Sequence, residues 1–592
     1  MFIHMEYMIE HLIRKPLTMK TKYNKKPAIK IEGNLHEGWD SIYNQIVTGQ
    51  ESKNTIIIDC YSGVHYDKLL LQFKKIEHTL FIDTSQLFKS EDEVIQMTSG
   101  FITDDVLFGY ISNLSIEDYF DNEKLLQARQ KINNNAGTCI IFGYGAGYVT
   151  DNGLTIYADM PRWEIQQRMR KNEAKALGVD NSKEQFSLQY KRGLFNDWRV
   201  CDKHKRSMYE RVDYWLDTTI ADSPKLMDKA SFMKGMDKAS KSPFRVVPFF
   251  DPAPWGGQWM KEVCNLNREV VNFGWCFDCV PEENSLLFEI NGTIFEMPSV
   301  NLVYLRSKEL LGEPVEARFG KEFPIRFDFL DTMDGGNLSL QVHPTTQYVH
   351  DNFGIHYTQD ESYYLVDVKE NASVYLGLKE GIDKNKMIEE LEKAQDGITV
   401  FDAEKYINKL PAKKHDHFLI PGGTIHCSGS NSVVLEISST PNIFTFKLWD
   451  WQRLGLDGKP RPINIERGKK VIQWNRDTQY INNNLVNIIT FIDEGEGWRE
   501  ERTGLHKTEF IETRRHIFTK LVKHITNDSV NVLNLVEGDE AIIKSPTNAF
   551  EPYIVHYAET FIIPASVGEY TIRPYGDAEG KQCITIKAYV RT

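Results

Sequence analysis

From residue 245 to its end the chain is a series of short apolar segments separated by turn residues, and this pattern most restricts the possible folds. Examples are "SYYLVDV" (362–368), "ASVYLGL" (372–378) and "SVVLEISS" (432–439). Many short strands at such spacing are typical of a β-sandwich or a β-barrel. The segment "DHFLIPGGTIHCSG" (416–429) is echoed by "ETFIIPASVGEYTI" (559–572), but only the first carries a histidine after the turn. We therefore predict two related β-barrels.

The first part of the chain has a different pattern. Apolar runs such as "TIIIDC" (55–60) and "GLTIYADM" (153–160) alternate with helical segments. This alternation predicts an α/β domain with a mostly parallel sheet. Residues 222–243 are polar and hold two copies of "MDKAS", which we interpret as a linker, with or without a short helix, rather than a true repeat. The change in composition places a domain boundary near residue 240.

A chain of 592 residues has room for three to five domains at roughly 100–200 residues each. The fold class we predict is an α/β N-terminal domain followed by an all-β pair of barrels with a helical insertion. The predicted division is an irregular lead-in over 1–50, a degenerate phosphate-loop-like α/β domain over 51–240, a metal-binding barrel over 245–480 with a helix inserted at 383–397, and a second barrel over 485–592.

Composition narrows the class of protein. A net charge of −13 argues against a general nucleic-acid binder. The eight cysteines are scattered, so no disulfide framework is expected, and the lone Cys276-Phe-Asp-Cys279 is more simply a pair of buried thiols than a metal site. Since no signal-peptide pattern and no run of 18 apolar residues occurs, we expect a cytoplasmic protein without a membrane partner. The sequence leaves the oligomeric state open.

Four residues on three sequence-distant segments suit a divalent metal. Gln341 and His343 are two apart, so on a strand they face the same side. Glu361 stands on the next strand, and His426 follows a Pro-Gly-Gly-Thr turn. One amide oxygen, two imidazoles and one carboxylate suit zinc, and other divalent ions fit as well. Each residue alone is equally compatible with an ordinary barrel position, so the pattern leaves both interpretations open.

Two segments of the first part suggest phosphate binding only weakly. "GYGAGYV" (143–149) lacks the lysine and the Ser/Thr of a phosphate loop, so a turn at a strand end is the simpler interpretation. The basic stretch "KRGLFNDWRVCDKHKR" (191–206) could hold a phosphate or form a solvated helical face, and the latter is favoured. We expect no ATP hydrolysis from this domain.

The C-terminal part also carries an ordered set of motifs. They are "PWGG" (254–257), "LSLQVHP" (338–344), "DESYYLVD" (360–367), "FLIPGGTIH" (418–426), "LEIS" (435–438) and "LWDWQRLGLDGKPRPINIERG" (448–468). From about Asp251 onward the chain resembles type I mannose-6-phosphate isomerase, a zinc-dependent cupin enzyme. The first 240 residues lie outside this resemblance and are vaguely similar to P-loop nucleoside kinases at "YADMPRWEIQQRMR" (157–170).

The resemblance implies a fold, a reaction and a site. It implies one zinc per chain, or another divalent metal, and interconversion of mannose 6-phosphate and fructose 6-phosphate through a cis-enediol. The metal ligands that it implies are Gln341, His343, Glu361 and His426, and Glu436 corresponds to a carboxylate that lines the active site of the family. The implied partner is a small-molecule sugar phosphate.

Two positions depart from the family. Gln359 stands where the family has a lysine, two residues before the ligand glutamate. Lys447 stands where the family has an arginine, and it keeps the charge but loses the planar fork. We therefore expect Lys447 to hold the phosphate or to act with Glu436 as an acid or base, unless Arg453 supplies the fork instead.

Three further functions compete with this isomerase hypothesis. The protein could be a non-catalytic sugar-phosphate sensor, which the two departures and the large N-terminal addition favour. It could be an isomerase or epimerase of another sugar. A purely structural barrel leaves the ordered motifs unexplained and is the weakest alternative.

Overall fold

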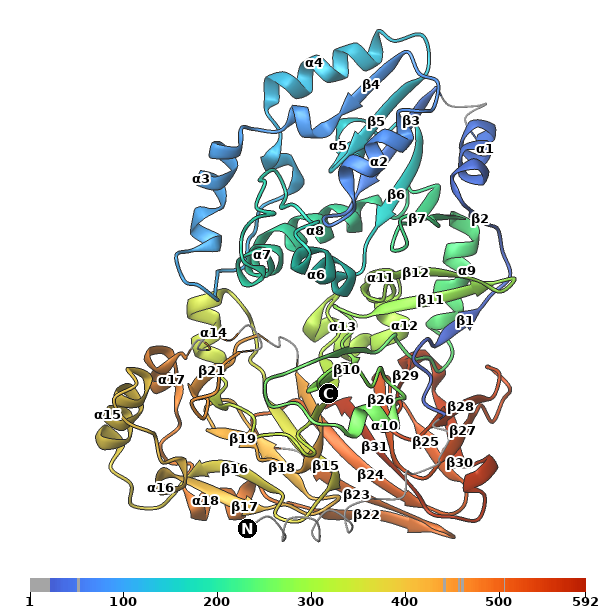
Figure 1. Cartoon of the computed structure of the whole chain (residues 1–592). Coiled ribbons are helices and arrows are strands. Elements are labelled where there is room, and N and C mark those ends of the chain that lie inside the picture. The colour runs from blue at the N-terminus through green and yellow to red at the C-terminus, as the bar shows by residue number, and fades with distance from the viewer. Residues whose placement is uncertain are drawn as a thin grey trace, which may run out of the picture.

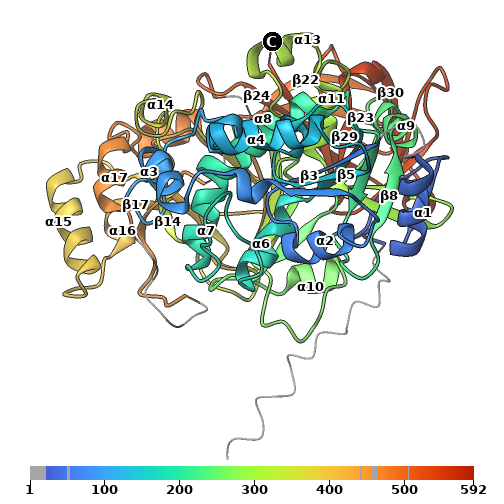
Figure 2. The ribbon, with the colours of Figure 1, turned by 90° about the horizontal axis from the view of Figure 1, so that it is seen from above.

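The computed structural model describes residues 22–49, 54–439, 443–455, 458, 461, 463–504 and 506–591. In Figure 1 an α/β part lies above a region rich in strands, and Figure 2 views the same arrangement from above, along the direction in which the parts stack. No helix among the described residues is long and apolar enough to cross a membrane. All eight cysteines are buried and free, which agrees with the expectation of no disulfide framework.

The N-terminal part is built on a sheet of seven strands. Its order is β2 (Leu35–Glu37), β8 (Lys225–Asp228), β7 (Tyr214–Asp217), β6 (Leu154–Asp159), β3 (Thr55–Cys60), β5 (Cys139–Gly143) and β4 (Leu80–Asp83). The five strands from β7 to β4 are parallel. At one edge β8 is antiparallel to β7, and β2 is antiparallel to β8. The side chains of the central strands are buried on both faces of the sheet, which is usual for a parallel sheet.

Helices accompany this sheet along the chain (Figure 1). They are α1 (Trp39–Gly49), α2 (Tyr66–Phe73), α3 (Glu91–Ile102), α4 (Asn122–Asn133), α5 (Ala146–Val149), α6 (Arg162–Arg170), α7 (Phe186–Arg192), α8 (Trp198–Met208) and α9 (Lys229–Ala239). The segment 143–149 spans the end of β5, a turn at residues 144 and 145, and helix α5, so the predicted turn at the end of the strand is present. Helix α8 buries Lys205 while Lys203 and Arg206 are exposed, so only part of the basic stretch is a solvated face.

Two predictions for this part are wrong. The predicted irregular lead-in contains β1 (Ala28–Lys30), β2 and α1, because β2 pairs with β8 and β1 pairs with a strand some 250 residues away. The predicted linker at 222–243 forms β8 and α9, and both contribute buried residues to the core. In both segments long-range pairing supplies the order that the local composition did not indicate.

Two sheets form the middle of the chain and hold the residues of interest. The six-stranded sheet has the order β18 (His417–Ile420), β15 (Glu361–Val368), β20 (Ser432–Ser439), β13 (Ile325–Asp331), β10 (Trp275–Cys279) and β9 (Phe249–Asp251). The five-stranded sheet has the order β17 (Ile407–Pro411), β16 (Ser373–Leu378), β19 (His426–Ser428), β14 (Leu340–Val342) and β21 (Phe446–Trp449). The predicted helical insertion is confirmed as α15 (Lys384–Gln395), capped by Asp383.

Two further sheets follow at the C-terminal end (orange to red in Figure 1). One contains β22 (Thr490–Gly495), β23 (Trp498–Gly504), β24 (Ile511–Phe518), β31 (Cys583–Val590), β26 (Asn531–Glu537) and β29 (Thr560–Ile563). The other contains β25 (Val522–Ile525), β30 (Glu569–Pro574), β27 (Glu540–Lys544) and β28 (Tyr553–His556). All pairings within these two sheets are antiparallel.

A small sheet ties the N-terminal part to the rest. Strands β11 (Ser285–Ile290) and β12 (Thr293–Pro298) form a hairpin, with Asn291 and Gly292 both at positive φ in the turn. Strand β1 adds to it in parallel. The remaining helices are α10 (Trp259–Val263), α11 (Val300–Leu305), α12 (Ser307–Leu311), α13 (Glu313–Phe319), α14 (Thr346–Phe353), α16 (Ala403–Tyr406), α17 (Ile465–Val471) and α18 (Thr478–Asn484).

Candidate metal centre

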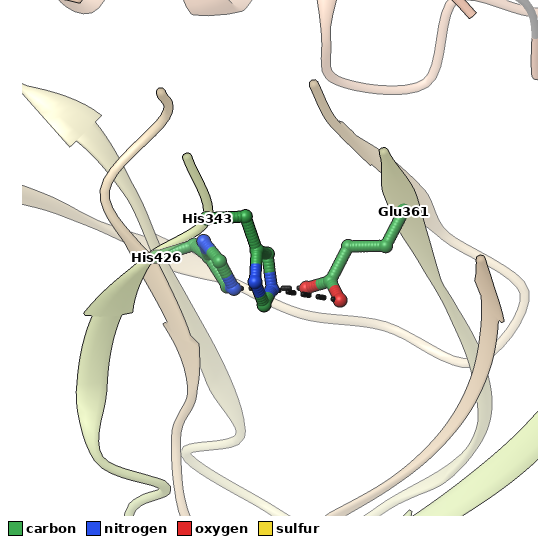
Figure 3. Close-up of side chains that lie close together, drawn as sticks. All are labelled: His343, Glu361 and His426. Atoms are coloured by element: carbon green, nitrogen blue, oxygen red, sulfur yellow. Dashed lines mark ion pairs between the residues drawn. The ribbon is translucent and has the colours of Figure 1, made fainter. Parts of the chain in front are cut away.

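Two imidazoles and one carboxylate converge inside the middle pair of sheets (Figure 3). His343 directly follows β14, Glu361 begins β15, and His426 begins β19. The Glu361 carboxylate lies 3.0 Å from Nε2 of His343 and 2.8 Å from Nε2 of His426. Among the residues that the structure describes, these form the only group of three or more His, Cys, Asp or Glu side chains whose ligand atoms all lie within 4.8 Å.

The hydrogen bonds behind the two imidazoles fix which nitrogen faces the centre. Nδ1 of His343 lies 3.2 Å from the backbone oxygen of Phe444, and Nδ1 of His426 lies 2.9 Å from that of Thr424. Because a carbonyl only accepts, each Nδ1 carries a proton, and each neutral ring then presents the Nε2 lone pair to the centre. Such backing of a metal-bound histidine by a carbonyl is a common second layer around a metal.

Buried lone pairs without a hydrogen bond make this group suited to a cation. Nε2 of His343 and Oε1 of Glu361 make no hydrogen bond although both are buried. Burial raises the pKa of Glu361, but positive charge at the positions of the two imidazoles lowers it well below its ordinary value, so this carboxylate favours a nearby cation. Three converging donors of nitrogen and oxygen type match the ligands of zinc and related divalent ions. The residues present therefore fit a divalent metal.

Gln341 is also brought to this centre. It pairs with His426 across strands β14 and β19, and its side-chain amide lies 3.3 Å from Nε2 of His426. The amide nitrogen and oxygen can exchange places by a simple flip, which would turn the oxygen toward the same point. All four predicted metal ligands thus gather in one place.

A second group of carboxylates lies beside Glu361. Glu436 on β20 pairs across strands with Asp328 on β13, and both are almost fully buried. Nε2 of Gln359 bridges the carboxylates of Glu361 and Glu436, at distances of 3.0 Å and 3.2 Å. Burial and the charges of Asp328 and Glu361 raise the pKa of Glu436 well above its ordinary value. Glu436 is consequently a buried acid that releases its proton less readily than an ordinary glutamic acid.

One arginine offsets these negative charges. Nε of Arg326 lies 3.0 Å from Asp328, and its Nη2 lies 3.8 Å from Glu436. Burial raises the pKa of Asp328 to about 6, despite the opposing effect of Arg326. Three buried carboxylates face a single guanidinium here, so the group has room for further positive charge.

Positive charge gathers on the strand next to Gln341. Lys447 on β21 is opposite Gln341 in the register, so both side chains lie on the same face of the sheet. Asp450 accepts from Arg453 at 2.7 Å and from Arg461 at 2.8 Å. Burial and the Arg461 guanidinium, with a smaller effect of Arg453, lower the pKa of Lys447 to about 8. Lys447, Arg453 and Arg461 thus lie around the single carboxylate of Asp450, so positive charge is in excess here. We call these four residues the cationic rim.

Sequence reasoning placed some of these residues and missed others. Arg453 was considered as a free fork for the substrate, but its guanidinium already bonds Asp450 and the backbone oxygen of Asn337. Arg326, Asp328 and Arg461 were not singled out. Arg461 lay within a quoted motif, whereas the charges of Arg326 and Asp328 carried no distinctive local pattern.

Comparisons with known proteins cover the two parts separately. A family model described as "Domain of unknown function (DUF8485)" matches residues 38–241. The chain is 27% identical over 233 residues to "Probable mannose-6-phosphate isomerase GmuF" of Bacillus subtilis (strain 168), covering 39% of this chain and 68% of that protein. It is 26% identical over 220 residues to the mannose-6-phosphate isomerase of Streptococcus mutans serotype c, covering 37% and 64%. The chain is thus similar in part, at modest identity, to proteins of the mannose-6-phosphate isomerase family.

Two solved structures align with part of the chain. The mannose 6-phosphate isomerase of Bacillus subtilis aligns with a TM-score of 0.48 and 18% identity, over 59% of this chain and 100% of that one. A structure described as "a putative mannosephosphate isomerase from Archaeoglobus fulgidus" aligns with a TM-score of 0.45 and 18% identity, over 59% of this chain and 98% of that one.

Proposed function

We propose that this protein is a metal-dependent aldose–ketose isomerase that interconverts mannose 6-phosphate and fructose 6-phosphate. The observation that carries the proposal is the convergence of His343, Glu361 and His426 beside a rim of excess positive charge. The partial similarity to mannose-6-phosphate isomerases supports the choice of reaction and substrate. In this proposal the two pairs of sheets are two cupin barrels, of which the first binds the metal.

Gln341, His343, Glu361 and His426 would hold the metal, and zinc suits this mixture of imidazole, amide and carboxylate. When bound, the metal supplies Lewis acidity that polarises the oxygens on C1 and C2 of the sugar. The carbonyl oxygens of Phe444 and Thr424 keep both imidazoles in the orientation that presents Nε2.

The cationic rim would bind the phosphate. Lys447 lies nearest to the metal ligands by register, and Arg461 and Arg453 stand behind it around Asp450. A phosphate dianion would offset the crowding of positive charge that lowers the pKa of Lys447. This arrangement would fix the sugar between the rim and the metal ligands.

Glu436 would move the proton. It would take the proton from C2 of the open-chain aldose and return it to C1, while the proton of the O2 hydroxyl passes to O1. A buried carboxyl whose pKa is raised above its ordinary value binds a proton more readily, which suits a group that accepts and then returns a proton during one turnover. The side-chain amide of Gln359 donates to both Glu436 and Glu361. In this proposal Glu361 binds the metal and Glu436 carries the proton.

The test is a coupled assay of the purified full-length protein with mannose 6-phosphate, before chelation, after chelation and after zinc is restored. We expect fructose 6-phosphate to form, to cease on chelation and to return with zinc. Protein that carries stoichiometric metal and turns over neither mannose 6-phosphate nor other sugar phosphates would contradict the proposal.

A non-catalytic sugar-phosphate sensor is the second candidate. It is favoured by Gln359, because a neutral amide occupies the place where the isomerases that the sequence resembles carry a lysine. A panel of sugar phosphates separates the candidates: turnover of another sugar phosphate indicates an isomerase or epimerase of different specificity, whereas binding without turnover indicates the sensor.

A further inference from the structure

A cavity of about 400 Å³ lies between the N-terminal part and the first pair of barrel sheets. One wall is formed by residues 111–114, Arg162 and helix α8; the other comes from 280–283, 300–304, 321–322, 354–357 and 443–444. None of the four candidate metal ligands lines it. Its volume falls within the range of about 300–1,000 Å³ that is usual for small-molecule sites.

The position of the cavity follows the rule for ligand sites in open parallel sheets. The chain runs from β3 to β4 and β5 on one side of β3, and then crosses to β6 and β7 on the other side. Ligands bind such sheets beyond the carboxyl ends of the strands, where this change of direction occurs. Arg162 lines the cavity and follows the carboxyl end of β6, so the cavity lies on the side of the sheet where the strands end.

Three cations line the cavity from one face of helix α8. Arg199, Lys203 and Arg206 are spaced by four and three residues, which places them on the same side of the helix. None of them forms an ion pair with a carboxylate of the described residues; Lys203 bonds the hydroxyl of Ser115, and Arg206 lies over the ring of Tyr304. Arg162, in contrast, is neutralised by Asp202 at 2.5 Å.

The opposite wall offers acceptors and aromatic rings. Glu282 has a buried carboxylate oxygen without a hydrogen bond, and Glu322 accepts only from the hydroxyl of Tyr357 within the described part of the chain. Burial, together with the charge of Glu322, raises the pKa of Glu282 to about 7. Unpaired carboxylates beside Tyr304 and Tyr357 are suited to the hydroxyl groups and the apolar face of a sugar.

We propose that this cavity binds a phosphate monoester of a hydroxyl-rich molecule, with its phosphate on Arg199, Lys203 and Arg206 and its hydroxyls toward Glu282 and Glu322. A sugar phosphate and a nucleoside monophosphate share this chemistry. The site is separate from the metal centre and does not depend on the isomerase proposal.

The site binds its ligand without transferring phosphate. After β3 the chain reads "YSGVHYDK" (61–68) into helix α2, without the Gly-Lys-Ser/Thr that would hold a triphosphate and magnesium. Arg168 instead bonds the backbone oxygens of Gly63 at 3.0 Å and Thr218 at 2.9 Å. Asp59 is occupied by the backbone amides of Gly145 and Gly147. The sheet edge beside the cavity is therefore closed by internal contacts.

The cavity also touches the support of the metal centre. Phe444 lines it, and the backbone oxygen of the same residue holds Nδ1 of His343. An occupant that orders this segment would also order His343, so ligand and metal affinities should rise together. This coupling, unlike the binding site itself, depends on the proposed metal centre.

The test is a calorimetric titration of the full-length protein with glucose 6-phosphate and with adenosine 5′-monophosphate, repeated with Arg199→Gln/Arg206→Gln and with Lys203→Glu. We expect one of the two probes to bind at millimolar concentration or below, and both variants to weaken that binding by about tenfold or more. The probe that binds identifies the source of the phosphate. Lys203 is exposed, so its variant remains informative if the double variant does not fold.

Lys447→Gln serves as the matched control, because it removes a cation from the barrel rim and none from the cavity. Binding that survives Lys447→Gln but not the α8 variants supports the cavity site. Binding lost only with Lys447→Gln places the phosphate in the barrel, and it overturns the proposal, as does the absence of binding by both probes. Either result leaves the isomerase assay unaffected, so the two proposals fail independently.

Discussion

At the scale of single residues, the candidate metal centre consists of two imidazoles that share one carboxylate. His426→Ala removes one of the three converging donors. We expect metal content to fall from about one equivalent to near zero, a larger loss than the roughly 10- to 100-fold that removal of a second-layer partner costs. The measurement is metal analysis after dialysis, with circular dichroism to show that the fold remains.

His350→Ala is the control, since this histidine is largely exposed and lies outside the centre. Equal metal content in His426→Ala and the wild-type protein would show that these residues are ordinary barrel side chains.

Lys447 gives the rim a dependence of stability on pH. Its pKa is about 8 in the folded protein and 10.5 ordinarily, because burial and Arg461 disfavour its charge. Between these values the unfolded chain binds the proton and the folded one does not, so stability rises with pH across this window. Relative to Lys447→Met, the free energy of unfolding should rise by up to about 3 kcal/mol from pH 8 to 10.5.

Denaturant unfolding at several pH values measures this difference. Lys523→Met is the control, because Lys523 is exposed on β25. Parallel pH profiles for wild-type protein and Lys447→Met would show that Lys447 keeps its ordinary pKa, and the crowding of the rim would then be absent.

At the scale of elements, the sequence predicted the helices and strands that have a recognisable local pattern. Short apolar segments between turn residues located strands such as β15, β16 and β20. The sequence did not predict that β8 and α9 pack into the core. Their polar composition resembles a linker, and their packing partners are distant in sequence. Of the candidate site, sequence motifs pointed to Gln341, His343, Glu361 and His426, which the structure brings together. Arg326 and Asp328 become neighbours only through the pairing of β13 with β20, which no local pattern shows.

Two helical glycines test whether α9 is a packed element. A Cβ on Gly235 in α9 would stand 2.2 Å from the ring of buried Phe288, whereas one on Gly100 in α3 would meet nothing within 4 Å. Gly235→Ala should therefore destabilise the protein by about 1–3 kcal/mol through overpacking. Gly100→Ala should stabilise it by about 0.5–1 kcal/mol.

Both variants are compared with wild-type protein by denaturant unfolding. If Gly235→Ala proved as stable as Gly100→Ala, α9 would not be pressed against the β11–β12 hairpin, and the original interpretation of this segment as a linker would be restored.

At the scale of the whole molecule, the N-terminal part and the part that holds the middle pair of sheets meet in an aromatic cluster next to the candidate metal centre. Phe108, from the loop that follows α3, stacks on Phe444 at 6.0 Å and contacts Phe353 at 5.4 Å between ring centroids. Asp105 in the same loop pairs with Arg467 of α17 at 2.6 Å. In Figures 1 and 2 helix α3 reaches toward α14 and α17. The N-terminal part thus supports the segment whose carbonyl orients His343.

Phe108→Ala tests this long-range support. Removing the buried ring should cost about 3–5 kcal/mol of stability. It should also weaken metal binding by about tenfold, because Phe444 loses its packing partner and its backbone oxygen holds Nδ1 of His343 less firmly. Competition with a chelator of known affinity measures the second effect. Phe491→Ala, at a ring that is half exposed in the C-terminal sheets, should change neither quantity appreciably. If Phe108→Ala lowered stability without any change in metal affinity, the two parts would share a core, but the N-terminal part would not support the candidate metal centre. The contact between the two parts would then serve the cavity between them.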